Sequence, residues 1–82
     1  MSPYVKKSRR EILDINPTFA TTPGDLAYVL FKTLIGYKNK HNEEFYIHNE
    51  IIGVMDCVKE EYRRRFLNEY EDRKIRESGD IG

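Results

Sequence analysis

The sequence lacks several features by which small proteins are usually classified. Cys57 is the only cysteine, so no disulfide can form within the chain and a reducing compartment is expected. Basic and acidic residues number 14 each, which excludes the strong basic excess of a general nucleic-acid coat. The longest apolar run, from "LAYVL" to Ile35, is broken by Lys32 and Thr33 and is too short to span a bilayer.

The first residues, "MSPYVKKSRR", are basic but contain no apolar block of the kind found in a secretory signal. We therefore expect a soluble cytoplasmic protein with no membrane partner. A chain of 82 residues is expected to fold as a single domain, residues 1–82, with a modest core.

Apolar residues recur at helical rather than strand spacing, so the sequence predicts an all-α fold. We expect a helical hairpin of two long helices, with a short N-terminal helix and a polar C-terminal tail. The predicted segments are an irregular stretch with a short helix (1–21), a helix (22–38), a second helix (43–67) and a short helix or tail (68–82).

Two helix starts carry recognisable capping patterns. Ser8 and Glu11 have the spacing of a capping box and predict a short helix, packed through Ile12, Leu13 and Phe19. "TPGD" is the better signal, because Thr22 can cap, Pro23 suits the first helical position, and the Asp25 carboxylate can reach back to the cap amide. Gly79 is a plausible stop for the last helix.

Residues 26–37 are apolar around most of the predicted helix, with only Lys32 and Gly36 marking a clearly different side. One partner helix covers one face, and the N-terminal segment can cover part of another. Since large exposed apolar patches are unusual on soluble monomers, we expect a homo-oligomer. The predicted oligomer interface contains Tyr28, Phe31 and Ile35. The alternative is that the N-terminal segment covers this surface by itself.

The second long helix carries a single apolar face at spacings of three and four, which is typical of a core-facing helix. Arg65 falls on the centre line of the same face if the helix is regular. Beyond Phe66 this face is occupied by Glu69 and Asp72. Either the helix continues past its core or the chain bends near "LNEY", and the periodicity does not decide between these. The apolar face consists of Ile47, Ile51, Val54, Met55, Val58, Tyr62 and Phe66.

The segment "VKEEYRRRFLNEYEDRK" is the strongest chemical feature. Arginine pairs bidentately with phosphate or carboxylate, and a nearby tyrosine can stack on a base. In a regular helix Lys59, Arg63, Tyr70 and Lys74 share one side within about 60° of arc. The alternative is that Arg65 only pairs with a neighbouring glutamate and the other charges are solvated, each pair contributing about 0.3–0.5 kcal/mol. The candidate ligand-binding residues are Lys59, Tyr62, Arg63, Arg65, Tyr70 and Lys74.

Other chemistries find little support. His41 and His48 have no partner at the four-residue spacing of a zinc helix, so no metal site is expected. Cys57 has no histidine at a convincing helical spacing, and adjacent carboxylates such as Glu60 and Glu61 point apart. We expect no catalytic residues, no cofactor and no enzyme activity.

Three stretches, "PGDLAYV", "NEIIGVMDCVKEEYRRR" and "YEDRKIRESGDI", resemble motifs of an uncharacterised family of small bacteriophage and bacterial proteins. The resemblance covers residues 23–81 and implies a helical fold, a phage-type origin and no assigned activity. If a phage encodes the chain, its compartment is the host cytosol. Family members often have proline where Glu69 stands, which would favour a break before Tyr70.

These observations leave three hypotheses. The first is a non-enzymatic helical homo-oligomer that captures an anionic small molecule, such as a nucleotide signal of host defence. The second is an adaptor or inhibitor that binds a host protein. The third is nucleic-acid binding through "KKSRR" and "YRRR", which the balanced charge disfavours.

Overall fold

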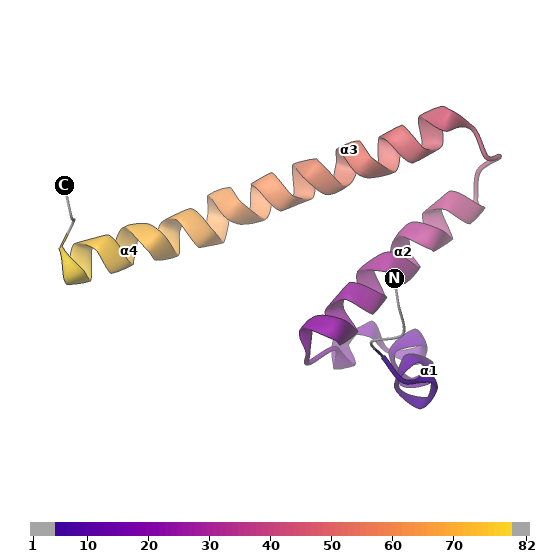
Figure 1. Ribbon diagram of the computed structural model, residues 1–82, viewed down its shortest axis with the longest axis horizontal. Coiled ribbons are helices and arrows are strands. Elements are labelled where there is room, and N and C mark those ends of the chain that lie inside the picture. Colours follow the sequence, from indigo (N-terminus) through magenta and orange to yellow (C-terminus); the bar gives the residue numbers. More distant parts are fainter. Residues whose placement is uncertain (1–4, 80–82) are drawn as a thin grey trace. The chain divides into compact units, whose positions relative to one another are not determined.

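The structure, a computed structural model, describes residues 5–79, and the elements over this range are all helical. The prediction of an all-α fold is therefore confirmed for these residues. The chain divides into two compact units, residues 1–44 and 45–82. In chain order (Figure 1) the elements are α1 (Lys7–Ile15), the 3₁₀ turn η1 (Pro17–Phe19), α2 (Pro23–Asn39), α3 (Phe45–Tyr62), the π-helical segment η2 (Arg63–Leu67) and α4 (Asn68–Ser78).

Helix α1 begins two residues too early for the predicted capping box, in which Ser8 would be the N-cap. Lys6 occupies the extended N-cap position and makes no side-chain cap hydrogen bond. Ser8 therefore lies inside the helix, where it lacks the extended backbone that a capping residue needs. The predicted packing is also only partly right, because Leu13 is 1% exposed whereas Ile12 is 42% and Phe19 is 52% exposed. One residue of α1, not two, enters the core.

Helix α2 begins as its sequence predicts. The Thr22 hydroxyl accepts a hydrogen bond from the Asp25 backbone N–H at 3.0 Å, and Pro23 fills the first position. The Asp25 carboxylate, however, accepts from the backbone N–H of Thr21, one residue before the cap, at 3.2 Å. The helix continues through Gly36 and ends at Asn39, one residue beyond the predicted end.

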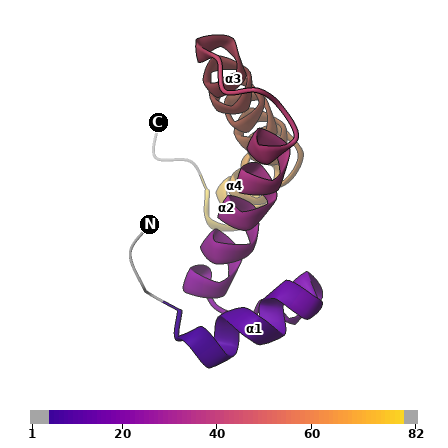
Figure 2. The same ribbon diagram turned by 90° about the vertical axis from the view of Figure 1, so that its right-hand side faces the viewer.

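A partly buried ion pair joins α1 to the start of α2. Asp25 is 5% exposed, and its Oδ2 accepts from Arg9 Nε at 3.2 Å and Nη2 at 2.9 Å. Arg9 Nη2 also donates to the backbone carbonyl of Phe19, at 2.7 Å, which ties the η1 turn to the same group. Figure 2 shows α1 lying across the N-terminal end of α2. These contacts and the buried Leu13 organise the first unit.

In the second unit α3, η2 and α4 follow one another as a single uninterrupted helix (Figure 1). Leu67 and Asn68 both have right-handed helical torsion angles. The helix therefore continues through "LNEY", where the sequence did not decide between continuation and a bend. The helix stops at Ser78, and Gly79, at φ +81°, donates its N–H to the Ile75 carbonyl at 2.7 Å. This is the stop predicted at Gly79.

Within residues 5–79, no helix combines the length and the apolar character needed to cross a membrane.

Candidate functional site

The arginine triplet coincides with a π-helical turn. The backbone N–H of Asn68 donates to the carbonyl of Arg63, five residues earlier, in place of the four-residue bond of an α-helix. A π turn holds about one residue more than an α turn, so every later side chain lags by about 100° around the axis. π turns of this kind are frequent at functional sites. The change of phase decides which residues share a face.

The π turn extends the apolar face and removes Arg65 from it. With the lag included, Phe66 and Tyr70 fall within about 30° of the line through Val58 and Tyr62, while Arg65 moves to the flank. The Tyr62 and Phe66 rings lie 5.1 Å apart between centroids. We use the term apolar stripe for Met55, Val58, Tyr62, Phe66 and Tyr70.

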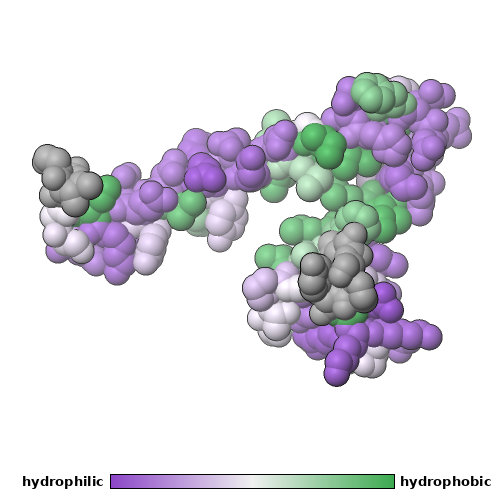
Figure 3. Space-filling model, in the orientation of Figure 1, coloured by the Kyte–Doolittle hydropathy of each residue, from purple (hydrophilic) through white to green (hydrophobic). Residues whose placement is uncertain are grey.

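The apolar stripe is exposed along its whole length. The exposed fractions of its five residues lie between 44% for Met55 and 65% for Tyr62. Figure 3 shows hydrophobic side chains at the surface of this helix among hydrophilic ones. Helix packing normally covers such a row of neighbouring apolar side chains. The row is therefore a candidate binding surface.

Two of the three arginines are neutralised locally. Glu61 Oε1 accepts from Arg64 Nη2, three residues along the helix, at 2.6 Å, and from Arg65 Nε, four residues along. The hydrogen bonds from Arg64 and then Arg65 lower the pKa of the Glu61 carboxyl below its ordinary value, against a small opposing effect of burial. Arg65 thus pairs with a neighbouring glutamate, which the sequence analysis gave as the alternative to ligand binding.

Arg63 differs from its two neighbours. Its guanidinium makes no hydrogen bond or ion pair with the residues from 5 to 79, and it lines a shallow surface groove with Cys57, Glu60 and Asn68. Lys59 precedes it by one turn on the same side and lies 3.8 Å from Asp56 and 3.9 Å from Glu60. Lys59 is therefore next to two carboxylates, whereas Arg63, one turn further on, has no such partner among residues 5–79.

The remaining candidate residues gather around Tyr70. The Lys74 ammonium lies 5.6 Å from the centre of the Tyr70 ring and the Arg73 guanidinium 6.0 Å, both within cation–π range. Because of the π turn this group is displaced by about a right angle from Lys59 and Arg63. The single cationic strip expected for a regular helix does not form, since the helix is not regular at η2.

The predicted oligomer residues lie on α2 in different surroundings. Phe31 is exposed and Ile35 half-buried, whereas the half-buried Tyr28 donates its hydroxyl to Asp14 Oδ1 at 2.7 Å. The Asp14 carboxylate, through this hydrogen bond first, raises the pKa of the Tyr28 hydroxyl. Leu26 and Leu30 are also more than half exposed.

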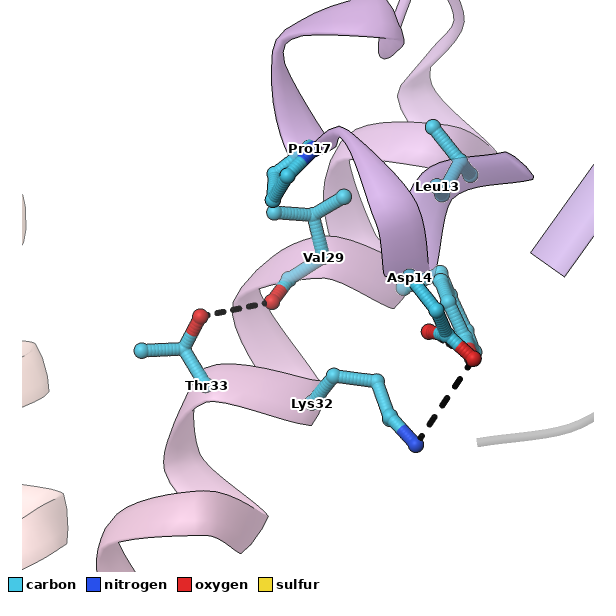
Figure 4. A pocket seen from close by; sticks show the side chains of 7 residues that line it. Leu13, Asp14, Pro17, Val29, Lys32 and Thr33 are labelled. Atoms are coloured by element: carbon cyan, nitrogen blue, oxygen red, sulfur yellow. Dashed lines mark hydrogen bonds and ion pairs between the residues drawn. The ribbon is translucent and has the colours of Figure 1, made fainter. Parts of the chain in front are cut away.

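A small pocket lies between α1, η1 and α2, and Figure 4 shows the side chains that line it. Lys32 Nζ stands 4.0 Å from Asp14 Oδ2, and the Thr33 hydroxyl donates to the Val29 carbonyl at 2.9 Å. Its charged groups therefore face one another and are satisfied within the unit. Leu13 and Pro17 form its apolar side.

Sequence reasoning missed the roles of Arg9 and Asp14. Both act on residues 14 or 16 positions away, Arg9 on Asp25 and Asp14 on Tyr28. No local spacing signals contacts of that length. Of the residues the structure describes, no three of His, Cys, Asp and Glu stand close enough together to hold a metal ion, and Cys57 is exposed as a free thiol.

Residues 1–81 match the sequence model of a domain of unknown function, DUF6899. The chain belongs to this family. The resemblance to an uncharacterised family is therefore confirmed, and the match covers residues 1–81 rather than 23–81. No curated protein and no solved structure matches this member of the family.

Proposed function

We propose that this protein acts by binding a protein partner rather than by catalysis, and that the apolar stripe of the α3–η2–α4 helix is the binding surface. The exposure of five adjacent apolar side chains in register carries the proposal. Burial of apolar surface is the dominant favourable contribution to most protein association, so a row of this length is a source of affinity.

The partner we propose is a second copy of the chain, which makes the protein a homo-oligomer. Its net charge is zero, so no long-range repulsion opposes self-association. The exposed Leu26, Leu30 and Phe31 of α2 provide further apolar surface that an assembly can cover. Pairing of the two long helices as a hairpin stays a prediction from the sequence, as does the phage-type origin.

Light scattering on the purified protein tests this proposal through its oligomeric mass. We expect a dimer or larger species, and Phe66→Glu should weaken self-association by about tenfold or more, because a carboxylate would have to be buried. Ile52→Glu is the matched control, since Ile52 is as exposed as Phe66 but lies off the apolar stripe. A monomer at high concentration, or equal effects of the two variants, would contradict the proposal.

A second candidate function is the binding of an anionic small molecule, and the unpaired Arg63 beside Lys59 favours it. These two cations suit a phosphate group, and Tyr62, one residue before Arg63 and largely exposed, suits a nucleotide base. Arg65 contributes less because Glu61 already holds it. A nucleotide signal of host defence is the ligand of this class that we propose.

Absorbance and thermal shift test the second candidate. The chain has no tryptophan, so a co-purified nucleotide would raise the absorbance at 260 nm relative to 280 nm visibly. Mono- and cyclic nucleotides should raise the melting temperature of the wild type and of Arg65→Ala, and should have little effect on Arg63→Ala. The absence of any shift would contradict nucleotide binding. Protein binding would then be the remaining proposal, with a host protein as the alternative to a second copy of the chain.

A further inference from the structure

The helix that carries the apolar stripe has its charges separated along its length. Residues 45–62 contain four carboxylates and one lysine, a net charge of −3 with histidine neutral. Residues 63–78 contain six cationic side chains and four carboxylates, a net charge of +2. The sign therefore changes between Tyr62 and Arg63, close to the middle of the helix and at the start of the π turn.

This separation distinguishes between the two ways in which a pair of identical helices can lie. In a parallel pair each half faces its own like-charged copy. In an antiparallel pair the acidic half of one helix faces the basic half of the other, and the two helix dipoles are also opposed. Complementary charge of this kind sets orientation more than it sets affinity.

We propose that two copies of this chain pair through the apolar stripe as antiparallel helices, with the twofold axis near the boundary between Tyr62 and Arg63. The inference rests on the proposed self-association and adds its orientation and centre. The sequence at the centre, "EEYRRR", is complementary to its own reverse: Glu60 and Glu61 of one copy lie opposite the arginines of the other. Tyr62 and Phe66 of both copies meet at the axis.

The π turn supports this arrangement. A regular helix would place Arg65 on the centre line of the stripe, and the antiparallel pair would then bring two such arginines into the apolar contact. In the structure Arg65 lies on the flank and is held by Glu61. The turn thus leaves an unbroken apolar row on both sides of the axis, from Met55 to Tyr70, with the arginine charges at its edges.

The test measures the distance between spin labels on two copies of the full chain, one label per chain. The native Cys57 is exposed and takes the first label. The other two positions, Asn49 and Arg76, are exposed and equally far from the proposed axis, and are used as Asn49→Cys and Arg76→Cys with Cys57→Ser.

An antiparallel pair predicts label separations along the axis of about 40 Å for both terminal positions and about 16 Å for Cys57. A parallel pair in register predicts about 10 Å at all three, the spacing between packed helices. Three equal short distances would therefore overturn the inference while leaving self-association intact. Unequal terminal distances would show that the axis lies elsewhere, which also overturns the inference. No dipolar coupling in any sample, with a monomer mass, would overturn the proposed function as well.

Discussion

At the scale of single residues, the first unit depends on a few side chains. Leu13 is the apolar residue of α1 that becomes buried, and the Arg9–Asp25 pair closes the same small core. A buried carboxylate is tolerated here because it accepts hydrogen bonds from a guanidinium and from the Thr21 N–H. We therefore expect each group to have its own effect on stability.

Leu13→Ala should lower the free energy of unfolding by about 2–5 kcal/mol, because it removes a fully buried side chain and leaves a cavity. Chemical denaturation followed by circular dichroism measures the loss. Ile12→Ala, at the neighbouring and much more exposed position, serves as the control and should cost clearly less. Equal losses would show that both side chains contribute to the core.

Asp25 should make the stability of the protein depend on acid pH. The Arg9 hydrogen bonds, then the Thr21 N–H, hold the pKa of Asp25 below its ordinary value of 3.8. A carboxyl with a lowered pKa stabilises the fold above its unfolded pKa, and this stabilisation is lost as the pH falls through the lowered folded value. Melting temperature should therefore fall as the pH drops below about 4.

Asp25→Asn should lower the melting temperature at neutral pH and make it less dependent on pH in the acid range. Asp72→Asn is the matched control, because Asp72 is exposed and makes no hydrogen bond or ion pair among residues 5–79. If both variants keep the wild-type acid profile, the ion pair between Arg9 and Asp25 does not contribute as described.

At the scale of elements, local signals place the start of α2 and the end of α4 correctly, although not the start of α1. Thr22, Pro23 and Gly79 act where the sequence indicates, because capping depends on residues within one turn. The register after Leu67 could not be predicted in the same way. An α and a π turn satisfy the same backbone groups with different partners, so the apolar pattern alone leaves the phase of α4 undecided.

Deletion of Arg64 should preserve self-association. Removing one residue from a π turn gives a regular α turn and leaves Phe66 and Tyr70 in the phase that they have in the structure. Inserting an alanine after Arg64 should instead turn these rings away by a further 100° or so and weaken association. Arg64→Ala controls for loss of the Glu61 hydrogen bond.

Sedimentation measures association in all three variants, and circular dichroism checks that they remain helical. If the wild-type helix were regular, deletion of Arg64 would have the opposite effect. The deletion would then rotate Phe66 and Tyr70 off the apolar stripe and abolish association.

At the scale of the whole molecule, the second unit is one helix on which Ile47 is the buried apolar residue and the apolar stripe is open. Isolated helices gain little stability from propensity alone and depend on packing of an apolar face. The self-association that we propose would supply such packing. The stability of this unit should therefore depend on protein concentration.

Dilution should reduce the helical signal at 222 nm and lower the melting temperature of the wild type. Phe66→Glu should start at the lower values and show no further dependence on concentration, while Ile52→Glu should follow the wild type. A melting temperature that stays constant over the whole concentration range would count against coupling between folding and self-association.

The sequence by itself determined the helical class, the start of α2 at Pro23, the stop at Gly79 and the row of apolar residues from Ile47 to Phe66. These follow from periodicity and capping, which act within a few residues. Only the tertiary structure decided that Arg9 pairs with Asp25, that Leu13 and not Ile12 is buried, and that the π turn carries the stripe on to Tyr70. Such features depend on contacts between distant residues, or on a choice between hydrogen-bond partners, which no local pattern specifies.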